Sequence, residues 1–306
     1  MSDYAVDITS LHKRYSNGTT ALNHVQLQVP QGCIFGLIGP NGAGKSTLIK
    51  SLLTIIRPTL CEGTMLGKPI GHKPTLSQVG YLPEHAQFPA YLTGREVIEY
   101  AAGLSHQSRF QCRVRCDDLL EKVGMNAHAH RRISTYSKGM KQRIGLAQAL
   151  IHQPQVVFLD EPTDGVDPEG RMIMKGIIAS LRDEGRTVFV NSHLLSEMEQ
   201  IADRVAILSQ GRIVAEGSIV DLTRKKALFE VSFIGQLPVR LMTWCQEHGM
   251  EISNDRIRCH AESAVMIQPL IDQLRGALLV IREIKEQRFS LEELFLQVLA
   301  DSRKNP

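Results

Sequence analysis

The chain has 306 residues, of which 43% are hydrophobic and 22% charged, as is typical of a soluble protein with one large or two ordinary domains. Its 35 basic and 32 acidic side chains leave a formal net charge of +3, too small to indicate a nucleic-acid partner. No apolar run approaches the length of a membrane span, and residues 1–7 lack the features of a secretory signal. We therefore expect a cytoplasmic location.

The six cysteines predict reduced thiols, because a disulfide framework belongs to oxidising compartments. Cys112 and Cys116 are four residues apart and could share a helical face, but no second pair at zinc-ligand spacing accompanies them. His128 and His130 alternate in a polar stretch, where surface histidines are the favoured interpretation. The sequence therefore predicts no zinc site.

Residues 6–8 and 25–29 alternate apolar and polar side chains, which predicts half-buried β-strands. Tyr15 lies between them, before the turn signal Ser-Asn-Gly at 16–18. Its ring could be a platform on which a base stacks, since every base has a π face. It could equally be an ordinary loop aromatic, and the residues alone leave both interpretations open.

Residues 39–47 match the pattern G-x-x-x-x-G-K-[ST] of a phosphate-binding loop. They are Gly39, Pro40, Asn41, Gly42, Ala43, Gly44, Lys45, Ser46 and Thr47. Gly42 and Gly44 allow backbone N–H groups to turn inward without a Cβ clash. Lys45 supplies a point charge for phosphates, and the Ser46 hydroxyl can ligate Mg²⁺.

The surroundings of this loop favour phosphate binding over a glycine-rich turn that binds nothing. Residues 33–38 form a short apolar run that predicts a buried strand, and residues 47–53 have apolar side chains at helical spacing. The order strand, glycine loop, helix directs the positive end of the helix toward bound phosphates.

Residues 79–84 predict a strand that a proline interrupts, and the pattern is helical from about 93 to 150. Thr93 and Glu96 fit a capping box at the start of that stretch. Because it interrupts an otherwise alternating α/β pattern, we expect an inserted helical subdomain.

Ser137 occupies an N-cap position inside this stretch, followed by Lys138 and Gly139. Apolar residues then recur at helical spacing up to about residue 151. Taken alone, this pattern predicts a helix cap and no more.

Residues 156–159 are an apolar run that ends in Asp160 and Glu161, which predicts a central strand delivering two carboxylates to its C-terminal edge. Ligands bind at that edge in open α/β sheets. Asp160 can hold Mg²⁺ directly or through water, and Glu161 can orient or deprotonate an attacking water. The alternative, that both acids only cap a turn, is disfavoured because a phosphate loop is present.

Residues 187–193 predict another strand, ending at His193, a residue that in isolation is more often structural. A helix at 194–201 and a hairpin of strands 204–209 and 212–217 follow. The charge run at 224–226 predicts a solvated linker.

Residues 227–306 predict a second domain with three strands, at 228–234, 251–260 and 278–284. Helices are expected near 238–248 and 263–275, and a last one starts at Ser290, where Glu293 completes a capping box. The order βαβαβα predicts a small α+β domain. It contains no catalytic constellation.

Read together, these motifs occur in the order found in the ATP-binding subunit of an ABC transporter, which residues 4 to about 222 resemble nearly throughout. The most specific part is Tyr-Ser-Lys-Gly-Met-Lys-Gln-Arg at 136–143, followed by a strand ending Leu-Asp-Glu-Pro-Thr. This form of the motif, with Gly-Tyr-Leu-Pro-Glu at 80–84, resembles the exporter ATPases for drugs, polysaccharides and ions. Members often have a C-terminal extension that ends like residues 289–295.

The resemblance implies an α/β P-loop NTPase fold with an ABC-type nucleotide-binding domain over residues 1–222. This domain would comprise a β-subdomain, a RecA-like core and the helical subdomain at about 93–150. Residues 227–306 would be an accessory or regulatory α+β domain.

The resemblance also implies a role for each matching residue. Tyr15 would stack on adenine, and residues 39–47 would hold the phosphates, with Lys45 as the catalytic cation. Asp160 and Ser46 would hold Mg²⁺. Glu161 would be the catalytic base, and His193 would contact the γ-phosphate.

Other matching residues would complete the site of a second protomer. Ser137 and Gly139, with Lys138 between them, would contact ATP bound to that protomer, and Asp167 would bridge the two sites. Lys138 is a departure, because the family usually has glycine there. Glu84 replaces the glutamine that reports the nucleotide to the membrane partner; its carboxylate can bind Mg²⁺ or water, but it adds negative charge beside the phosphates.

The implied function is ATP-driven transport, with export favoured, by a homodimer or heterodimer that closes on ATP and acts through a separate transmembrane permease. ATP and Mg²⁺ would be the cofactors, no nucleic acid is expected, and the protein would be peripheral on the inner face of the membrane. The alternative is a soluble mechanical ATPase acting on ribosomes or DNA. Such proteins tend to have two tandem cassettes or a coiled-coil insert, and neither is visible. A ligand-sensing role of residues 227–306 is compatible with transport.

Overall fold

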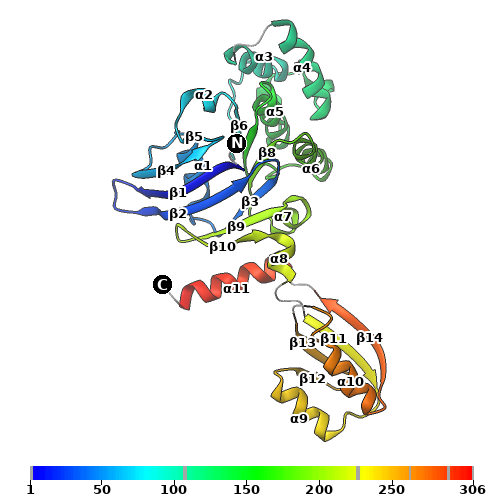
Figure 1. The fold of residues 1–306 in the computed structure, drawn as a ribbon. Helices are drawn as coiled ribbons and strands as arrows, with labels where there is room; N and C mark the ends of the chain where they lie inside the picture. Colours follow the sequence, from blue (N-terminus) through cyan, green and yellow to red (C-terminus); the bar gives the residue numbers. More distant parts are fainter. Residues whose placement is uncertain (1–2, 106–108, 225–227, 262, 288–289, 305–306) are drawn as a thin grey trace. The chain divides into compact units, whose positions relative to one another are not determined.

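The computed structural model describes residues 3–105, 109–224, 228–261, 263–287 and 290–304 (Figure 1). The chain forms two compact units, residues 1–216 and 217–306. Within the described ranges, no helix is both long and apolar enough to cross a bilayer. No cluster of three or more histidine, cysteine or acidic side chains in those ranges is arranged to hold a metal ion by itself.

The first unit contains two sheets. A four-stranded antiparallel sheet has the order β2-β1-β4-β5, with β1 at Tyr4–Arg14, β2 at Thr20–Pro30, β4 at Leu60–Met65 and β5 at Lys68–Pro69. A six-stranded sheet has the order β10-β9-β3-β8-β7-β6, with β3 at Ile34–Ile38, β6 at Val79–Leu82, β7 at Val156–Asp160, β8 at Thr187–Asn191, β9 at Arg204–Ser209 and β10 at Arg212–Ser218.

The centre of the six-stranded sheet is parallel, since β9, β3, β8, β7 and β6 pair in the same direction. Every residue of β3, β7 and β8 is buried, which explains why these strands are continuous apolar runs in the sequence. Phe189 of β8 packs on Phe35 of β3 and on Phe158 of β7, with ring centroids 5.6 and 5.2 Å away. These rings hold the three strands together below the loops at their carboxyl ends.

Helices follow the strands of this sheet, as expected for alternating α/β structure. They are α1 at Lys45–Leu52 after β3, α6 at Pro168–Asp183 after β7 and α7 at Leu195–Ile201 after β8. The short α2 at Lys73–Leu76 lies between β5 of the antiparallel sheet and β6. Between β6 and β7 the chain forms α3 at Gly94–Leu104, α4 at Arg109–Lys122 and α5 at Lys138–Leu150, with short 3₁₀ turns at Asn126–His128 and Ile133–Thr135. The three helices pack on one another as the inserted subdomain (Figure 1).

Several local predictions for this insert can be compared with the structure. Thr93 and Glu96 form the expected capping box at the start of α3. Cys116, Cys245 and Cys259 are buried and Cys33 and Cys61 are half-buried, whereas the side chain of Cys112 lies outside the described residues. His130 is exposed and His128 half-buried, in keeping with surface histidines.

The second unit comprises α8 at Ile219–Arg224, β11 at Leu228–Ile234, α9 at Val239–Glu247, β12 at Glu251–Ser253, β13 at Arg256–His260, α10 at Gln268–Gly276, β14 at Val280–Gln287 and α11 at Leu291–Lys304. Its antiparallel sheet has the order β12-β13-β11-β14. The segment from β11 to β14 is therefore a split βαβ arrangement, βαββαβ, of the ferredoxin-like type. Ser290 and Glu293 form the expected capping box of α11.

One predicted strand of this unit is wrong. Residues 251–260 form two short strands joined by a turn at Asn254 and Asp255, so the order is βαββαβα and not βαβαβα. Asn and Asp are turn formers. Ile252 and Ile257 are also an odd number of residues apart and could not share one face of a continuous strand, yet they pair across the hairpin. Of the expected linker, Arg224 ends α8, and residues 225–227 lie outside the described residues.

Candidate functional site

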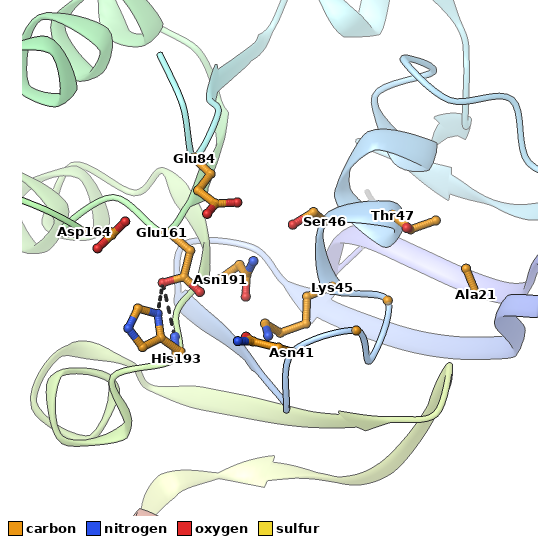
Figure 2. A pocket seen from close by; sticks show the side chains of 12 residues that line it. Ala21, Asn41, Lys45, Ser46, Thr47, Glu84, Glu161, Asp164, Asn191 and His193 are labelled. Atoms are coloured by element: carbon orange, nitrogen blue, oxygen red, sulfur yellow. Dashed lines mark hydrogen bonds and ion pairs between the residues drawn. The ribbon is translucent and has the colours of Figure 1, made fainter. Parts of the chain in front are cut away.

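A cavity of about 510 Å³ lies where β3, β7 and β8 end, at the carboxyl edge of the parallel strands (Figure 2). Its lining residues come from the glycine loop, from the strand ends and from one position in β2. They are Ala21, Asn41, Gly42, Gly44, Lys45, Ser46, Thr47, Glu84, Glu161, Asp164, Asn191 and His193. The glycine loop and the predicted strand ends at Glu161 and His193 therefore meet at one cavity.

The glycine loop connects β3 directly to α1. Gly42 and Gly44 have φ angles of 79° and 108°, in the left-handed region that side chains with a Cβ avoid. A Cβ on Gly44 would also lie 2.5 Å from the backbone oxygen of Ala21. Because α1 begins at Lys45, its unpaired N–H groups and the positive end of its dipole are at the cavity, an arrangement that suits an anion.

The Lys45 side chain is only 7% exposed. Its ammonium group donates hydrogen bonds to the backbone oxygens of Gly39, at 2.7 Å, and Pro40, at 3.3 Å. Burial lowers the pKa of Lys45, while the carboxylates of Glu161 and Asp160 act in the opposite direction. A buried ammonium group held by neutral carbonyls gains most from a strongly anionic partner, and a phosphate is such a partner.

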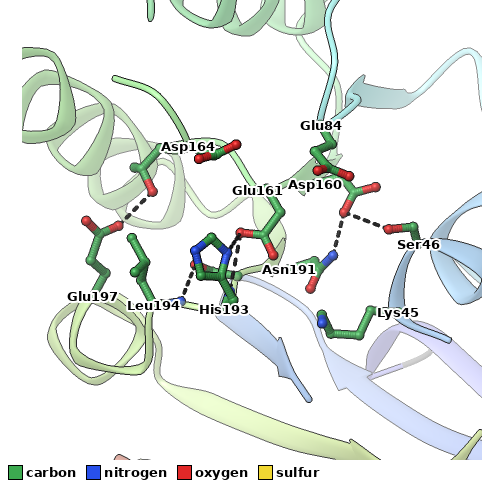
Figure 3. A network of polar contacts seen from close by, with 12 residues as sticks. Lys45, Ser46, Glu84, Asp160, Glu161, Asp164, Asn191, His193, Leu194 and Glu197 are labelled. Carbon is green, nitrogen blue, oxygen red and sulfur yellow. Dashed lines mark hydrogen bonds and ion pairs between the residues drawn. The ribbon is translucent and has the colours of Figure 1, made fainter. Parts of the chain in front are cut away.

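Asp160, the last residue of β7, is 1% exposed. Its Oδ1 accepts a hydrogen bond from the Ser46 hydroxyl at 3.3 Å and another from the Asn191 amide (Figure 3). A carboxylate and a hydroxyl beside a phosphate loop are the hard oxygen donors that Mg²⁺ prefers. The residues present therefore fit a magnesium ion bound together with phosphates.

Glu161 follows directly and has a φ of 51°, a strained conformation for a residue with a side chain. Its Oε2 accepts a hydrogen bond from the His193 backbone N–H at 3.2 Å and lies 2.7 Å from Nδ1 of the same residue (Figure 3). Burial raises the pKa of Glu161, partly offset by His193 and Lys45. A carboxylate with a raised pKa is a stronger base, as proton abstraction from water requires.

Comparison with known proteins identifies the family. A model described as ABC transporter matches residues 22–164. The chain is 39% identical to an uncharacterized ABC transporter ATP-binding protein of Synechocystis sp., over 92% of this chain and 79% of that protein. It is 31% identical to a daunorubicin resistance ATP-binding protein of Streptomyces coeruleorubidus, over 99% of this chain and 98% of that one. The chain belongs to the ABC transporter ATP-binding proteins.

A solved structure of an ATP-binding subunit of an ABC transporter superposes with a TM-score of 0.67 at 27% identity, over 72% of this chain and 92% of that one. The expected ABC-type P-loop fold is thereby confirmed. ATP hydrolysis is the activity of this family.

The signature segment of this ABC ATPase lies outside the cavity lining. Ser137 caps α5, accepting a hydrogen bond from the Met140 N–H at 3.2 Å, and Gly139 is buried behind it. The Lys138 ammonium is ion-paired with Asp164, which does line the cavity. Asp167, at the start of α6, is exposed. The lining of the cavity in one chain therefore does not include Ser137, Lys138, Gly139 or Asp167.

Two further expected residues of the ABC ATPase are at or near the cavity. The Tyr15 hydroxyl lies 3.3 Å from Oγ1 of Thr47, and the Lys13 ammonium lies over its ring, 4.9 Å from the centroid. Tyr15 itself does not line the cavity, so its contact with adenine stays a prediction. Glu84 does line the cavity, with its side chain 45% exposed.

Sequence reasoning missed Asn191, Asp164, Ala21 and Gln142. Asn191 ends the strand next to the one that ends in Asp160, so the rule that found Asp160 could have found it as well. Gln142 is buried, and its Nε2 donates to the backbone oxygens of Glu84, at 2.9 Å, and Glu161, at 3.4 Å. Those contacts have no signal in the local pattern.

Proposed function

We propose that this ABC ATPase forms a two-ATP sandwich with a second ATPase subunit and drives export through a separate transmembrane permease. The observation behind this proposal is that, within one chain, some of the family's motif residues line the cavity and others lie outside it. The cavity gathers Lys45, Ser46, Glu161 and His193, whereas Ser137 lies elsewhere. A nucleotide site of this kind is complete only when another subunit supplies the missing side.

Within each chain, the residues divide the work of hydrolysis. The glycine loop and Lys45 bind and orient the phosphates. Ser46 and Asp160 would hold Mg²⁺, and Glu84, which lines the same cavity, would bind the ion or one of its waters. When bound, Mg²⁺ neutralises phosphate charge. Glu161 takes the proton from water, and His193 fixes the orientation of Glu161.

The proposed contact with the second subunit uses the exposed starts of two helices. Ser137 and Lys138 are exposed at the start of α5, where free N–H groups suit a phosphate. Asp167 is exposed at the start of α6. ATP between two such subunits would stabilise the closed dimer, and hydrolysis would release it. The second subunit of this dimer is another copy of this chain or a related ATPase, and either one would occupy the same position.

Export and the membrane partner are proposed from the relatives. One of them is named for daunorubicin resistance, and this chain matches it over nearly its full length. The chain would therefore be peripheral on the inner face of the membrane, with Tyr15 stacking on adenine in the cytoplasm. The alternative, a mechanical ATPase acting on ribosomes or DNA, is not favoured, because the relatives are transporter proteins.

The dimer is tested by dilution. If two subunits share each site, the specific ATPase activity of the purified protein falls as the protein is diluted, and ATP causes the Glu161→Gln variant to elute as a dimer in size-exclusion chromatography. Specific activity that stays constant at every dilution would contradict the proposal. The permease is tested by co-purification of the chain with integral membrane proteins from detergent-solubilised membranes; recovery of the chain without any membrane protein contradicts that part.

A further inference from the structure

Asn191 occupies a position in the nucleotide site that no motif assigns. It is the last residue of β8, and it pairs in register with Asp160 at the end of β7. Its backbone oxygen accepts a hydrogen bond from the Glu161 N–H at 2.9 Å. The residue thus adjoins both acids of the site, and it lines the cavity that contains the phosphate loop.

The Asn191 side chain has one satisfied end and one unsatisfied end. Its amide N–H₂ donates to Asp160, while its Oδ1 is buried and accepts no hydrogen bond from any residue in the described part of the chain. Because a carboxylate can only accept, the N–H₂ group must face Asp160, and this fixes the direction of Oδ1. Buried carbonyl groups nearly always have a donor, so this one indicates a group that arrives with the substrate.

The protein donors near Oδ1 are already engaged. The Lys45 ammonium is directed at the backbone oxygens of Gly39 and Pro40. The Ser46 hydroxyl donates to Asp160. Figures 2 and 3 both show Asn191 between Glu161 and Lys45, the proposed base and the proposed phosphate-binding lysine. The remaining donor that the reaction itself requires there is water.

We propose that Asn191 positions the hydrolytic water: its N–H₂ group fixes the Asp160 carboxylate, and its Oδ1 accepts a hydrogen bond from the water that Glu161 deprotonates. A water molecule has two protons. If Glu161 accepts one and Asn191 the other, a lone pair of the oxygen is left free for the γ-phosphorus. This inference rests on the proposed hydrolysis at this site.

The step balances without any further reactant. The water oxygen forms a bond to the γ-phosphorus, and the bond from that phosphorus to the bridging oxygen of ADP breaks. Glu161 takes one proton of the water, and the other, held by Asn191 before the attack, stays on the new oxygen of inorganic phosphate. Asn191 neither gains nor loses a proton, so it is a positioning residue that touches the reacting water.

The test compares three variants in purified protein. Asn191→Leu keeps the branched outline of the side chain, with the same number of heavy atoms, but has neither donor nor acceptor. Asn191→Asp keeps the shape and an acceptor oxygen but loses the donor to Asp160. Thr187→Ala is the matched control, because Thr187 lies at the other end of β8, is buried and accepts a hydrogen bond from the Gly32 N–H. ATPase kinetics, equilibrium binding of a fluorescent ATP analogue and thermal unfolding are measured for each.

For Asn191→Leu we expect kcat to fall roughly 10- to 100-fold while the affinity for the ATP analogue changes by less than about threefold, because the contact is to the water and not to the nucleotide. Thr187→Ala should lower the unfolding temperature and leave kcat within about twofold of the wild type. An Asn191→Leu protein with wild-type kcat, or one that loses affinity and kcat by the same factor, overturns the inference.

The pH profile of Asn191→Asp gives a second, independent readout. At neutral pH two carboxylates would face each other at the ends of β7 and β8, so activity should be low. Protonation of the introduced group restores a donor toward Asp160 and leaves a carbonyl oxygen for the water, so activity relative to the wild type should rise as pH falls. A ratio that is independent of pH overturns the inference, and this variant decides the matter if Asn191→Leu does not fold.

The inference and the proposed function fail in different ways. If the wild-type protein hydrolyses no ATP, the proposed function is wrong. If the wild type hydrolyses ATP and Asn191→Leu does so equally well, hydrolysis at this site stands and only the role of Asn191 is wrong.

Discussion

The first unit places Asp160 and Glu161 at the end of a parallel strand, whereas the second places Glu230 in the middle of an antiparallel one. Neighbouring parallel strands all end at one edge, so their last residues gather around the cavity. In the antiparallel sheet, Glu230 of β11 faces β13, and it accepts hydrogen bonds from Arg256 and Arg258 at 2.8 Å each.

The two glutamates differ in pKa as a result. Burial raises the pKa of Glu161, although His193 and Lys45 lie close by. The hydrogen bond from Arg258, with the charge of Arg256, lowers the pKa of Glu230. The charge of Glu230 is compensated by two arginines of the neighbouring strand, so the role of this residue is structural. Glu161 keeps an incompletely compensated charge, which is what a base acting on a ligand needs.

The largest expected effect comes from removing the charge of Glu161. Glu161→Gln should lower kcat by roughly 10²- to 10⁴-fold, the usual contribution of a general base, while ATP stays bound. Steady-state ATPase assays and nucleotide-binding measurements check this. Glu230→Gln is the matched control, because it makes the same chemical change in the other unit and should leave turnover within about twofold. Normal hydrolysis by Glu161→Gln would refute its assignment as the base.

Removing the buried ammonium group at the cavity should have the next largest effect. Lys45→Ala removes charge-assisted hydrogen bonds to phosphate, each worth about 1.5–3 kcal/mol, so ATP affinity should fall roughly 10- to 100-fold. Titration with a fluorescent ATP analogue measures it. Lys50→Ala, at the other end of α1, is the control and should bind ATP normally. Unchanged affinity and turnover in Lys45→Ala would count against the role of the loop.

The pH dependence of turnover follows from the raised pKa of Glu161. Because folding raises this pKa above the ordinary value of 4.5, the carboxylate is protonated and lost as a base at a higher pH than an exposed glutamate would be. We therefore expect kcat to fall on acidification before exposed glutamates titrate. A kcat profile that stays flat down to the ordinary glutamate range would show that Glu161 does not act as the base.

The smallest effect is expected in the second unit. Since the pKa of Glu230 is lowered in the folded state, its stabilisation is present above the unfolded-state pKa and is lost as pH falls through the lowered value. Glu230→Gln should thus lower the unfolding temperature near neutral pH and approach the wild type in acid. Thermal unfolding at several pH values measures this. A difference that persists unchanged in acid would show that packing, and not charge, is responsible.

The sequence was sufficient for most of the first unit, for a physical reason. Central parallel strands are buried on both faces and therefore appear as continuous apolar runs, and the residue at which such a run becomes acidic, Asp160, marks the edge of the sheet. The glycine loop is equally local, because Gly42 and Gly44 are required by their own φ angles. Both features could be recognised without knowing any tertiary contact.

The missed features depend on contacts between distant segments. The burial of Gln142 results from packing α5 against the ends of β6 and β7, which no local pattern encodes. The unsatisfied oxygen of Asn191 becomes apparent only beside Asp160. In the second unit, Asn254 and Asp255 are a local turn signal that the prediction of one strand over residues 251–260 leaves out.

Gln142 also has a mechanical consequence. It lies on the 13-residue helix α5 that Ser137 caps, about 7.5 Å along the helix axis from Ser137. Its amide is bonded to the main chain of both Glu84 and Glu161. A helix is stiff over so short a length. A displacement of its first turn by a neighbouring subunit would therefore also move Gln142, one and a half turns away, and with it the backbone that orients Glu161.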